Sequence, residues 1–171
     1  MAHKTFRFHG GMQLDGHKQE SLQRALQQAS LPRQLIMPLK QHIGEYNKAV
    51  VEIGQRVLKG QLLASSAAPI SAAIHAPTSG TISAIDHFPI AHPSGQADTC
   101  IVIDVDDKDE SPSREIPAVQ SLSPAQMIAR VSEAGIAGLG GAAFPTSAKL
   151  QRAADQGIST LVINISPATI C

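Results

Sequence analysis

One stretch decides how the first half of this chain folds: Val51-Glu-Ile-Gly54-Gln-Arg-Val57-Leu-Lys-Gly60-Gln-Leu-Leu63. Apolar side chains recur in it at a fixed interval, and a glycine stands midway between each pair. Glycine is favoured where a chain turns tightly or where two backbones approach closely, and the apolar residues between such turns can line a small core. The spacing therefore predicts very short strands joined by tight turns.

The same pattern of short apolar runs, separated by glycine and proline, extends from about Gln34 to Val105. The strand candidates are residues 35–37, 49–53, 62–64, 70–74, 81–85 and 100–105. Several short strands at close spacing are typical of a small all-β sandwich or barrel. Together with Ala76-Pro-Thr-Ser-Gly80-Thr-Ile82, the first stretch resembles the barrel-sandwich hybrid of biotinyl and lipoyl domains.

Biotinyl and lipoyl domains carry their cofactor on a lysine at a hairpin tip, and this chain has no lysine there. Ala64-Ser-Ser-Ala-Ala-Pro-Ile70 occupies the tip, and no lysine occurs between Lys59 and Lys108. The sequence therefore predicts that no lipoyl or biotin group is attached. A docking or spacing module is the favoured interpretation of the barrel.

A second distinctive stretch, which we name the glycine loop (135–149), reads Gly135-Ile-Ala-Gly138-Leu-Gly140-Gly141-Ala-Ala-Phe144-Pro-Thr-Ser-Ala-Lys149. Its glycines predict positive φ angles and close approach to a ligand, and Thr146 or Ser147 is expected to cap the helix that follows. A glycine loop that runs into a helix N-terminus offers free N–H groups to an anion, and Lys149 adds a cation. The spacing matches neither the dinucleotide-binding fingerprint nor the P-loop, so a flexible turn with an ordinary surface lysine is the alternative.

The glycine loop resembles the flavin- and NADH-binding loop of the complex I flavoprotein. It is more similar still to the C subunit of Rnf-type ion-translocating electron transport complexes. Further segments similar to that protein are residues 8–11 with 17–18, 38–44, 75–81, 91–94 and 161–164. The resemblance implies FMN and NADH as cofactors, with cofactor-binding roles for Gly138, Gly140, Gly141, Phe144 and Lys149. It assigns no catalytic residue and no metal ligand to this chain.

The chain departs from the family pattern in two ways. Ala143 and Ser147 stand where glycine is usual, and each added side chain reduces the room for a ligand. The strand predicted at 159–165 is not followed by the family's acidic Glu-Cys-Glu-Pro segment, and no C-x-x-C motif occurs. We therefore expect a truncated second domain with little binding of its own, and iron–sulfur clusters only in a missing C-terminal part.

Four regions are predicted along the chain. They are a lead-in at 1–32, the barrel-sandwich hybrid at 33–106, a linker at 107–122, and at 123–171 the truncated beginning of a Rossmann-like flavin- and NADH-binding α/β domain. The linker follows from a composition rich in Asp, Glu, Ser and Pro. Ser123-Pro-Ala-Gln126 has the form of a capping box, which predicts a helix that Gly135 ends. The fold class is thus β plus α/β.

Composition excludes several functions. The formal net charge is +0 and no basic run is present, so the sequence does not predict nucleic-acid binding. No apolar run approaches the roughly 18 residues of a spanning helix, so no direct membrane span is predicted. His42, His75 and His92 could form a metal site, but no two of them have ligand spacing. Histidines that hold turns by hydrogen bonds are the favoured interpretation.

The resemblance implies an electron-transfer protein, the N-terminal part of the C subunit of an Rnf-type complex. Such a protein lies peripherally on the cytoplasmic side of the bacterial inner membrane and binds other subunits of the complex. It transfers electrons between NADH and ferredoxin-type carriers through flavin and iron–sulfur centres, coupled to ion translocation. Two alternatives stay open: a non-catalytic docking module, and the A subunit of the sodium-translocating NADH:quinone reductase, which lacks so full a glycine loop. Whether this chain is active alone is also open.

Overall fold

A computed structural model gives the fold and describes residues 16–17, 19–25, 27–113, 121–140, 142–160 and 162. The chain divides into two compact units, one of Met1–Ala29 with Pro167–Cys171 and the other of Ser30–Ser166. Within the described residues, the first unit has one regular element, a turn of 3-10 helix at Ser21–Gln23. The second unit holds the strands and both α-helices.

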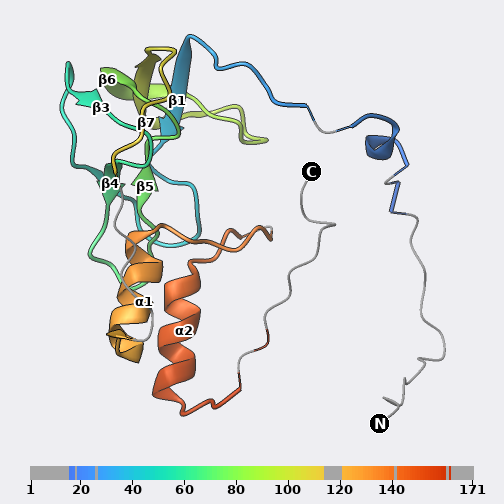
Figure 1. The fold of residues 1–171 in the computed structure, drawn as a ribbon, viewed down its shortest axis with the longest axis vertical. Helices are drawn as coiled ribbons and strands as arrows, with labels where there is room; N and C mark the ends of the chain where they lie inside the picture. Colours follow the sequence, from blue (N-terminus) through green and yellow to red (C-terminus); the bar gives the residue numbers. More distant parts are fainter. Residues whose placement is uncertain are drawn as a thin grey trace. The chain divides into compact units, whose positions relative to one another are not determined.

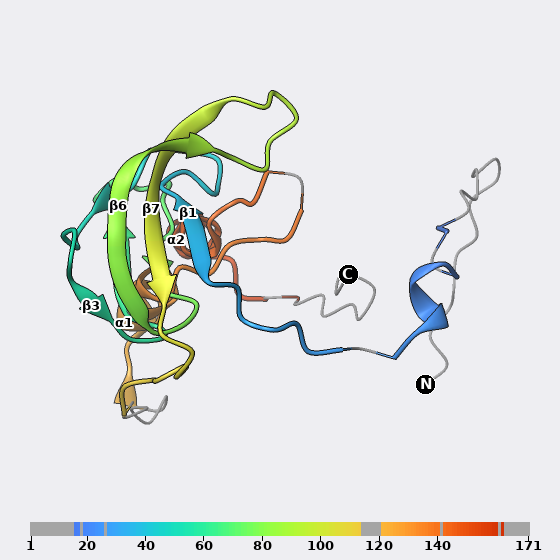
Figure 2. The same cartoon turned by 90° about the horizontal axis from the view of Figure 1, so that it is seen from above.

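Two antiparallel sheets build the barrel of the second unit (Figure 1). The larger sheet has the order β1-β7-β6-β3, with β1 at Gln34–Pro38, β3 at Arg56–Val57, β6 at Gly80–Pro89 and β7 at Ala97–Val105. The smaller sheet has the order β2-β4-β5, with β2 at Lys48–Ala49, β4 at Leu62–Ser65 and β5 at Ile74–His75. Figure 2 shows β6, β7 and β1 side by side in a strongly curved layer. A register shift between Ile82 and Ala84 contributes to this curvature, because a bulge bends the strand that carries it.

The predicted barrel of short strands is confirmed. Four predicted strands, at 35–37, 62–64, 81–85 and 100–105, lie inside β1, β4, β6 and β7. The predictions at 49–53 and 70–74 are largely wrong, because regular pairing includes only Ala49 of the first and Ile74 of the second. Local hydrogen bonds compete with pairing before Ile74, where the Ser71 hydroxyl donates to two carbonyl oxygens of the preceding turn. The two-residue strand β3 was not predicted.

The apolar residues of the opening stretch form the centre of the barrel. Val57 and Leu63 have no exposed surface, and Val51 keeps only 5% of its own. Branched side chains of β6 and β7 complete this core; they are Ile82, Ile101 and Ile103. Gly54 and Gly60 have φ angles of 87° and 79°, as the predicted tight turns require.

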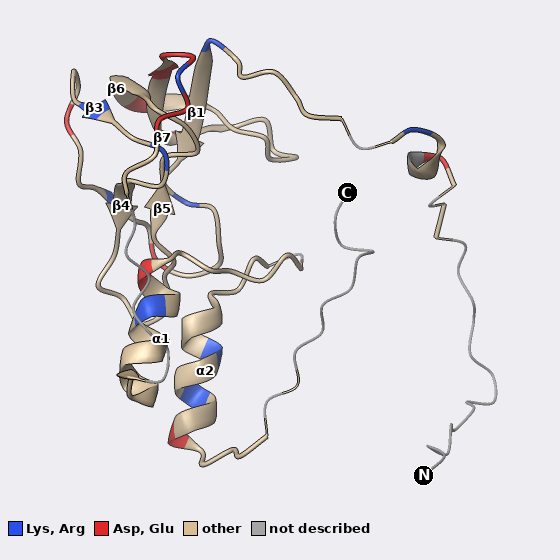
Figure 3. Cartoon of the chain, in the orientation of Figure 1, with Lys and Arg blue, Asp and Glu red and all other residues tan. Residues whose placement is uncertain are grey.

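Residues 106–110, which we name the strap, fold back along the barrel instead of leaving it as a free linker. The Arg56 guanidinium lies 3.0 Å from Asp106 and 2.7 Å from Glu110, and the Lys59 ammonium lies 2.6 Å from Asp109. The backbone N–H of Lys59 also donates to the Glu110 carbonyl oxygen at 2.8 Å. Figure 3 shows acidic and basic segments close together around β3 and the end of β7. The predicted linker at 107–122 is therefore wrong in its first part, because residues 107–110 are attached to the barrel.

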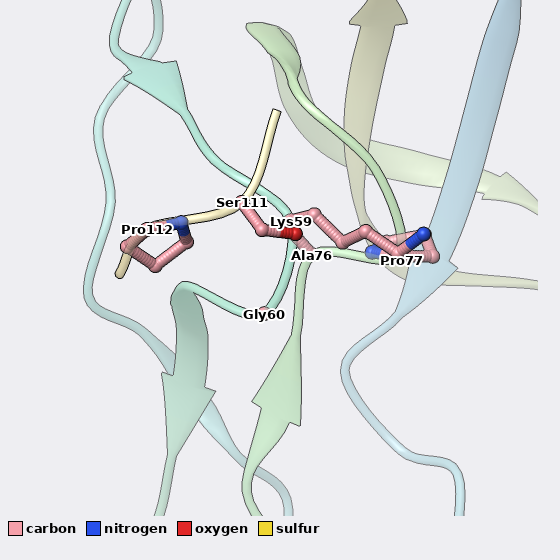
Figure 4. Close-up of a pocket in the computed structure, with 6 residues that line it drawn as sticks. All are labelled: Lys59, Gly60, Ala76, Pro77, Ser111 and Pro112. Atoms are coloured by element: carbon pink, nitrogen blue, oxygen red, sulfur yellow. The ribbon is translucent and has the colours of Figure 1, made fainter. Parts of the chain in front are cut away.

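Asp106 and Asp109 of the strap are stabilised in their charged form. A hydrogen bond from the Ser79 hydroxyl, supported by Arg56, lowers the pKa of Asp106. Lys59 lowers the pKa of Asp109 in the same way. Beyond the strap lies a shallow pocket of about 380 Å³, drawn in Figure 4. Its lining residues are Lys59, Gly60, Ala76, Pro77, Ser111 and Pro112.

Two ten-residue helices follow, α1 at Pro124–Glu133 and α2 at Thr146–Asp155, and they pack side by side (Figure 1). The predicted capping box of α1 is confirmed, because Ser123 and Gln126 each bond the other's backbone N–H. Ser159, Thr160 and Val162 belong to no regular element, and the rest of the strand predicted at 159–165 lies outside the described residues. The Rossmann-like sheet therefore stays a prediction.

Candidate functional site

The glycine loop connects α1 to α2 and is closed at its base like a hairpin. The N–H of Gly138 donates to the Phe144 carbonyl oxygen, and that of Thr146 to the Ile136 carbonyl oxygen, both at 2.9 Å. Between these bonds, Ala137 and Pro145 form an antiparallel bridge. The tip projects into solvent, with Leu139 80% exposed. The loop is therefore a hydrogen-bonded protrusion.

Three of the five predicted site residues come together at this loop. The Lys149 ammonium lies 5.6 Å from the centre of the Phe144 ring. It also lies 3.6 Å from the position that a Cβ on Gly138 would occupy. Gly140 is exposed at the tip, where a Cβ would have no neighbour within 4 Å. Gly141 lies outside the described residues, so its predicted role is untested.

The predicted positive φ angles are only partly correct. Gly135 has a φ of 66°, but Gly138 and Gly140 have ordinary backbone conformations. Ala143 instead takes the left-handed region, with a φ of 43°. That conformation costs a non-glycine residue about 1–2 kcal/mol. It is held by a turn in which the Ala143 N–H donates to the Gly140 carbonyl oxygen at 2.9 Å.

The predicted cap of α2 is wrong. Pro145 occupies the N-cap position, and no side chain accepts a hydrogen bond from the first turn. Thr146 is the first helical residue and cannot cap, while Ser147 is buried, with 6% of its surface exposed. The start of α2 consequently lacks a side-chain cap, and Lys149 is the fourth residue of this helix.

These features fit the phosphate end of a nucleotide or flavin. A phosphate needs N–H donors, positive potential and space, and an uncapped helix start beside a lysine offers the first two. Space is present at Gly140, whose missing side chain leaves the tip open. The amides of Gly138, Ala143 and Thr146 are already used inside the loop, so they hold its shape rather than a ligand.

The barrel supports the glycine loop at two points. At its start, Gly135 lies so close to Ala73 that a Cβ would overlap the Ala73 carbonyl oxygen. Near its tip, the Ala142 carbonyl oxygen accepts a hydrogen bond of 3.0 Å from the Ile43 N–H. We name Ala73 and Ile43 the two rests of the loop. No sequence pattern points to them, although segment 38–44 carries part of the family resemblance.

A cleft of about 900 Å³ opens between the glycine loop and the β6–β7 hairpin. Figures 1 and 2 show both projecting on the same side of the unit. Its floor includes Lys40, whose ammonium lies 4.6 Å from the centre of the Tyr46 ring. The Tyr46 hydroxyl donates to Asp98 at 3.2 Å, and this bond to a carboxylate raises the pKa of Tyr46. Sequence reasoning did not find this pair, because its members lie on separate segments.

The interpretation that histidines hold turns is confirmed at two positions. His42 bonds the backbone of Ile43 and Ala72, and His92 bonds Ser94. Both line the cleft. Among the described residues, no group of three His, Cys, Asp or Glu side chains is arranged to hold a metal ion. No helix in that part of the chain is long and apolar enough to cross a bilayer.

Comparison with known proteins agrees with this architecture. The family model of the RnfC barrel sandwich hybrid domain matches residues 6–108. The C subunit of an ion-translocating oxidoreductase complex from Vibrio cholerae is 41% identical over 169 residues, which is 98% of this chain and 21% of the relative. Proteins of the same name from Pseudomonas aeruginosa and Klebsiella pneumoniae are 44% and 43% identical, over 92% and 94% of this chain and 20% and 21% of the relatives.

The chain thus spans about a fifth of the length of the curated relatives it matches. The matched family domain covers the whole barrel and most of the strap, and the similarity to the relatives continues through the glycine loop. The chain therefore belongs to the RnfC family, whose relatives are the C subunits of ion-translocating oxidoreductase complexes.

Proposed function

We propose that this chain forms the N-terminal part of the C subunit of an Rnf-type electron transport complex. In the complete protein, the glycine loop binds the phosphate end of FMN or NADH. The observation that carries this proposal is the grouping of Lys149, Phe144 and Gly138 in the loop that leads into the uncapped start of α2, with Gly140 open at the tip. Backbone that carries no side chain lets a ligand approach closely, and a lysine supplies charge to a phosphate.

Each residue has a distinct part in this proposal. Lys149 pairs with the phosphate, Gly140 leaves room for it, and Phe144 offers a ring edge to the planar part of the cofactor. The bound flavin would supply the electron transfer between NADH and iron–sulfur carriers. The protein's share is binding and orientation. The sheet that completes a Rossmann-like pocket, and the iron–sulfur ligands, belong to sequence beyond this chain.

The same proposal extends to location and partners. The names of the relatives describe a complex that moves ions, and electron flow that drives ion movement requires a membrane. We therefore infer that this part of the protein lies peripherally at the cytoplasmic face of the bacterial inner membrane, against other subunits. The barrel fits this role as a docking or spacing module, because its hairpin tip has no lysine to carry a lipoyl or biotin group.

A chimera tests the proposal. Residues 1–162 would replace the matching part of the Vibrio cholerae relative, and the purified protein would be titrated with FMN and with NADH. Gly140→Val should abolish binding while leaving the fold intact, since no protein atom lies near the added side chain. Lys149→Ala should weaken binding by about 1–3 kcal/mol, the usual scale for a charge-assisted hydrogen bond.

The control is Lys48→Ala, which removes an exposed lysine of strand β2 in the barrel. It should bind both ligands like the parent chimera. If the parent binds flavin or NADH and both glycine-loop variants bind as tightly, the glycine loop is not the cofactor site. The barrel would then be better described as a docking module.

A further inference from the structure

His42 is a buried histidine whose protonation state follows from its partners. Its Nε2 accepts a hydrogen bond of 3.0 Å from the Ala72 backbone N–H, which can only donate. Its Nδ1 lies 2.9 Å from the Ile43 carbonyl oxygen, which can only accept. These partners fit the tautomer with a proton on Nδ1 and a lone pair on Nε2. Both ring nitrogens are engaged, each with a different segment of the barrel.

Those two segments are held together at several further points. The Asn47 side-chain amide donates to the Ala72 carbonyl oxygen at 2.9 Å, so Ala72 is bonded through both its N–H and its C=O. Gly44, with a φ of 117°, lies so close to Ile70 that a Cβ would overlap the Ile70 carbonyl oxygen. Segments 38–47 and 70–73 thus form one tightly bonded unit, and His42 lies at its centre.

The glycine loop rests on these same two segments. Ile43, whose carbonyl oxygen is held by His42, donates its N–H to Ala142. Ala73, which follows the residue bonded to His42 Nε2, contacts Gly135. The His42 ring therefore helps to fix the relative position of the two rests, together with the contacts of Asn47 and Gly44. Immediately after Ala142, Ala143 keeps its left-handed conformation, which persists only when the surroundings fix it.

We propose that His42 is a positioning residue for the glycine loop. By joining the two rests through its two ring nitrogens, it fixes the geometry that the loop presents to its ligand. The barrel is then more than a spacer, since it sets the shape of a binding element that lies more than ninety residues further along the chain. The claim that His42 positions the glycine loop stands on the hydrogen bonds described above. The claim that this position affects ligand binding rests on the proposed function.

The test uses two variants that each preserve one side of the ring. His42→Gln keeps an acceptor near the Nε2 position and loses the donor to Ile43, whereas His42→Asn keeps a donor near Nδ1 and cannot reach Ala72. The measurement is the hydrogen exchange of individual backbone amides of this chain, monitored by NMR. The Ile43 amide reports docking directly, because its hydrogen bond is the contact to Ala142.

Both variants should lower the protection of the Ile43 amide roughly tenfold, a factor that corresponds to about 1.4 kcal/mol. The Ala72 amide should stay protected in His42→Gln and lose protection in His42→Asn. The Ile82 amide, bonded to Gln55 inside the barrel, should not change, which separates loss of docking from unfolding. His92→Gln is the matched control, since His92 lines the same cleft but its ring is hydrogen-bonded to its near neighbour Ser94 and not to either rest.

Unchanged protection of Ile43 in both His42 variants would overturn the proposal, and so would an equal loss in the His92 control. The chimera adds a functional reading: His42→Asn should raise the FMN dissociation constant roughly tenfold at a temperature where the barrel stays folded. If the parent chimera binds no flavin, the proposed function fails, and the amide exchange still decides whether His42 positions the loop.

Discussion

Replacing Gly80 by alanine should destabilise the barrel, although the glycine has an ordinary φ angle. A Cβ at Gly80 would overlap the Asp104 carbonyl oxygen and lie 2.8 Å from Cγ2 of Ile103. Gly80 pairs with Val105 on one side and with Val57 on the other, so it lies between strands β7 and β3. The backbone of β6 or β7 must therefore move to admit one methyl group.

The size of the effect follows from two opposing contributions. Overpacking a tight core costs about 1–3 kcal/mol, whereas replacing glycine by alanine restricts the unfolded chain and returns about 0.4–1 kcal/mol. The expected net loss is about 1–2 kcal/mol. For a protein of this size, that lowers the melting temperature by roughly 2–8 °C. Gly80→Val should cost more, because two further methyl groups meet the same backbone.

Thermal unfolding followed by circular dichroism measures this change. Gly140→Ala is the matched control, because the same substitution there meets no atom and requires no unusual φ angle. It should stabilise the protein by about 0.4–1 kcal/mol, through the same restriction of the unfolded chain. If Gly80→Ala melts at the temperature of the parent, the close packing between β6 and β7 is not what requires a glycine.

Four further outcomes are expected. Ala143→Gly should stabilise the chain by up to about 1 kcal/mol in denaturant unfolding, because it relieves a left-handed alanine; a loss of stability would contradict the strain. Because Tyr46 is the only tyrosine, absorbance titration should find its pKa above the ordinary value of about 10, and Asp98→Asn should lower it. The lowered pKa values of Asp106 and Asp109 contribute stability that is fully present above the ordinary aspartate pKa of about 3.9 and is lost as pH falls through the folded-state values. The melting temperature should therefore drop in acid, and it should drop less in an Asp106→Asn, Asp109→Asn double variant. Finally, intact mass after expression with lipoyl and biotin ligases should equal that of the unmodified chain, and an adduct would refute the absence of an attachment site.

The barrel could be predicted because its signals are local and repeat. Val51, Val57 and Leu63 are spaced by turns that glycine makes possible, and each of them is buried. The same local reasoning failed where distant groups compete. Ile70 accepts a hydrogen bond from the Glu45 N–H, and the Ala72 N–H donates one to His42, instead of pairing as a strand. No periodicity shows such contacts.

The candidate site was predictable in composition but not in geometry. The run of glycines indicated a ligand-binding loop, yet the strained residue is Ala143, and the predicted caps Thr146 and Ser147 are displaced by Pro145. The two rests are invisible in the sequence, because Ile43 and Ala73 act through backbone groups that every residue possesses. A pattern of side chains cannot reveal which peptide groups meet.

The strap has a consequence for how this protein tolerates changes in length. Its ion pairs fix the point where the chain leaves the barrel, while Gly135 and Ala142 fix the point where it returns. The intervening segment therefore closes a loop between two anchors that do not depend on it. Doubling the length of such a loop costs only about 0.6 kcal/mol. Ser113, an exposed residue between these two anchors, is consequently a natural insertion point, where evolution can add sequence and where a fluorescent or affinity domain can be introduced without disturbing the glycine loop.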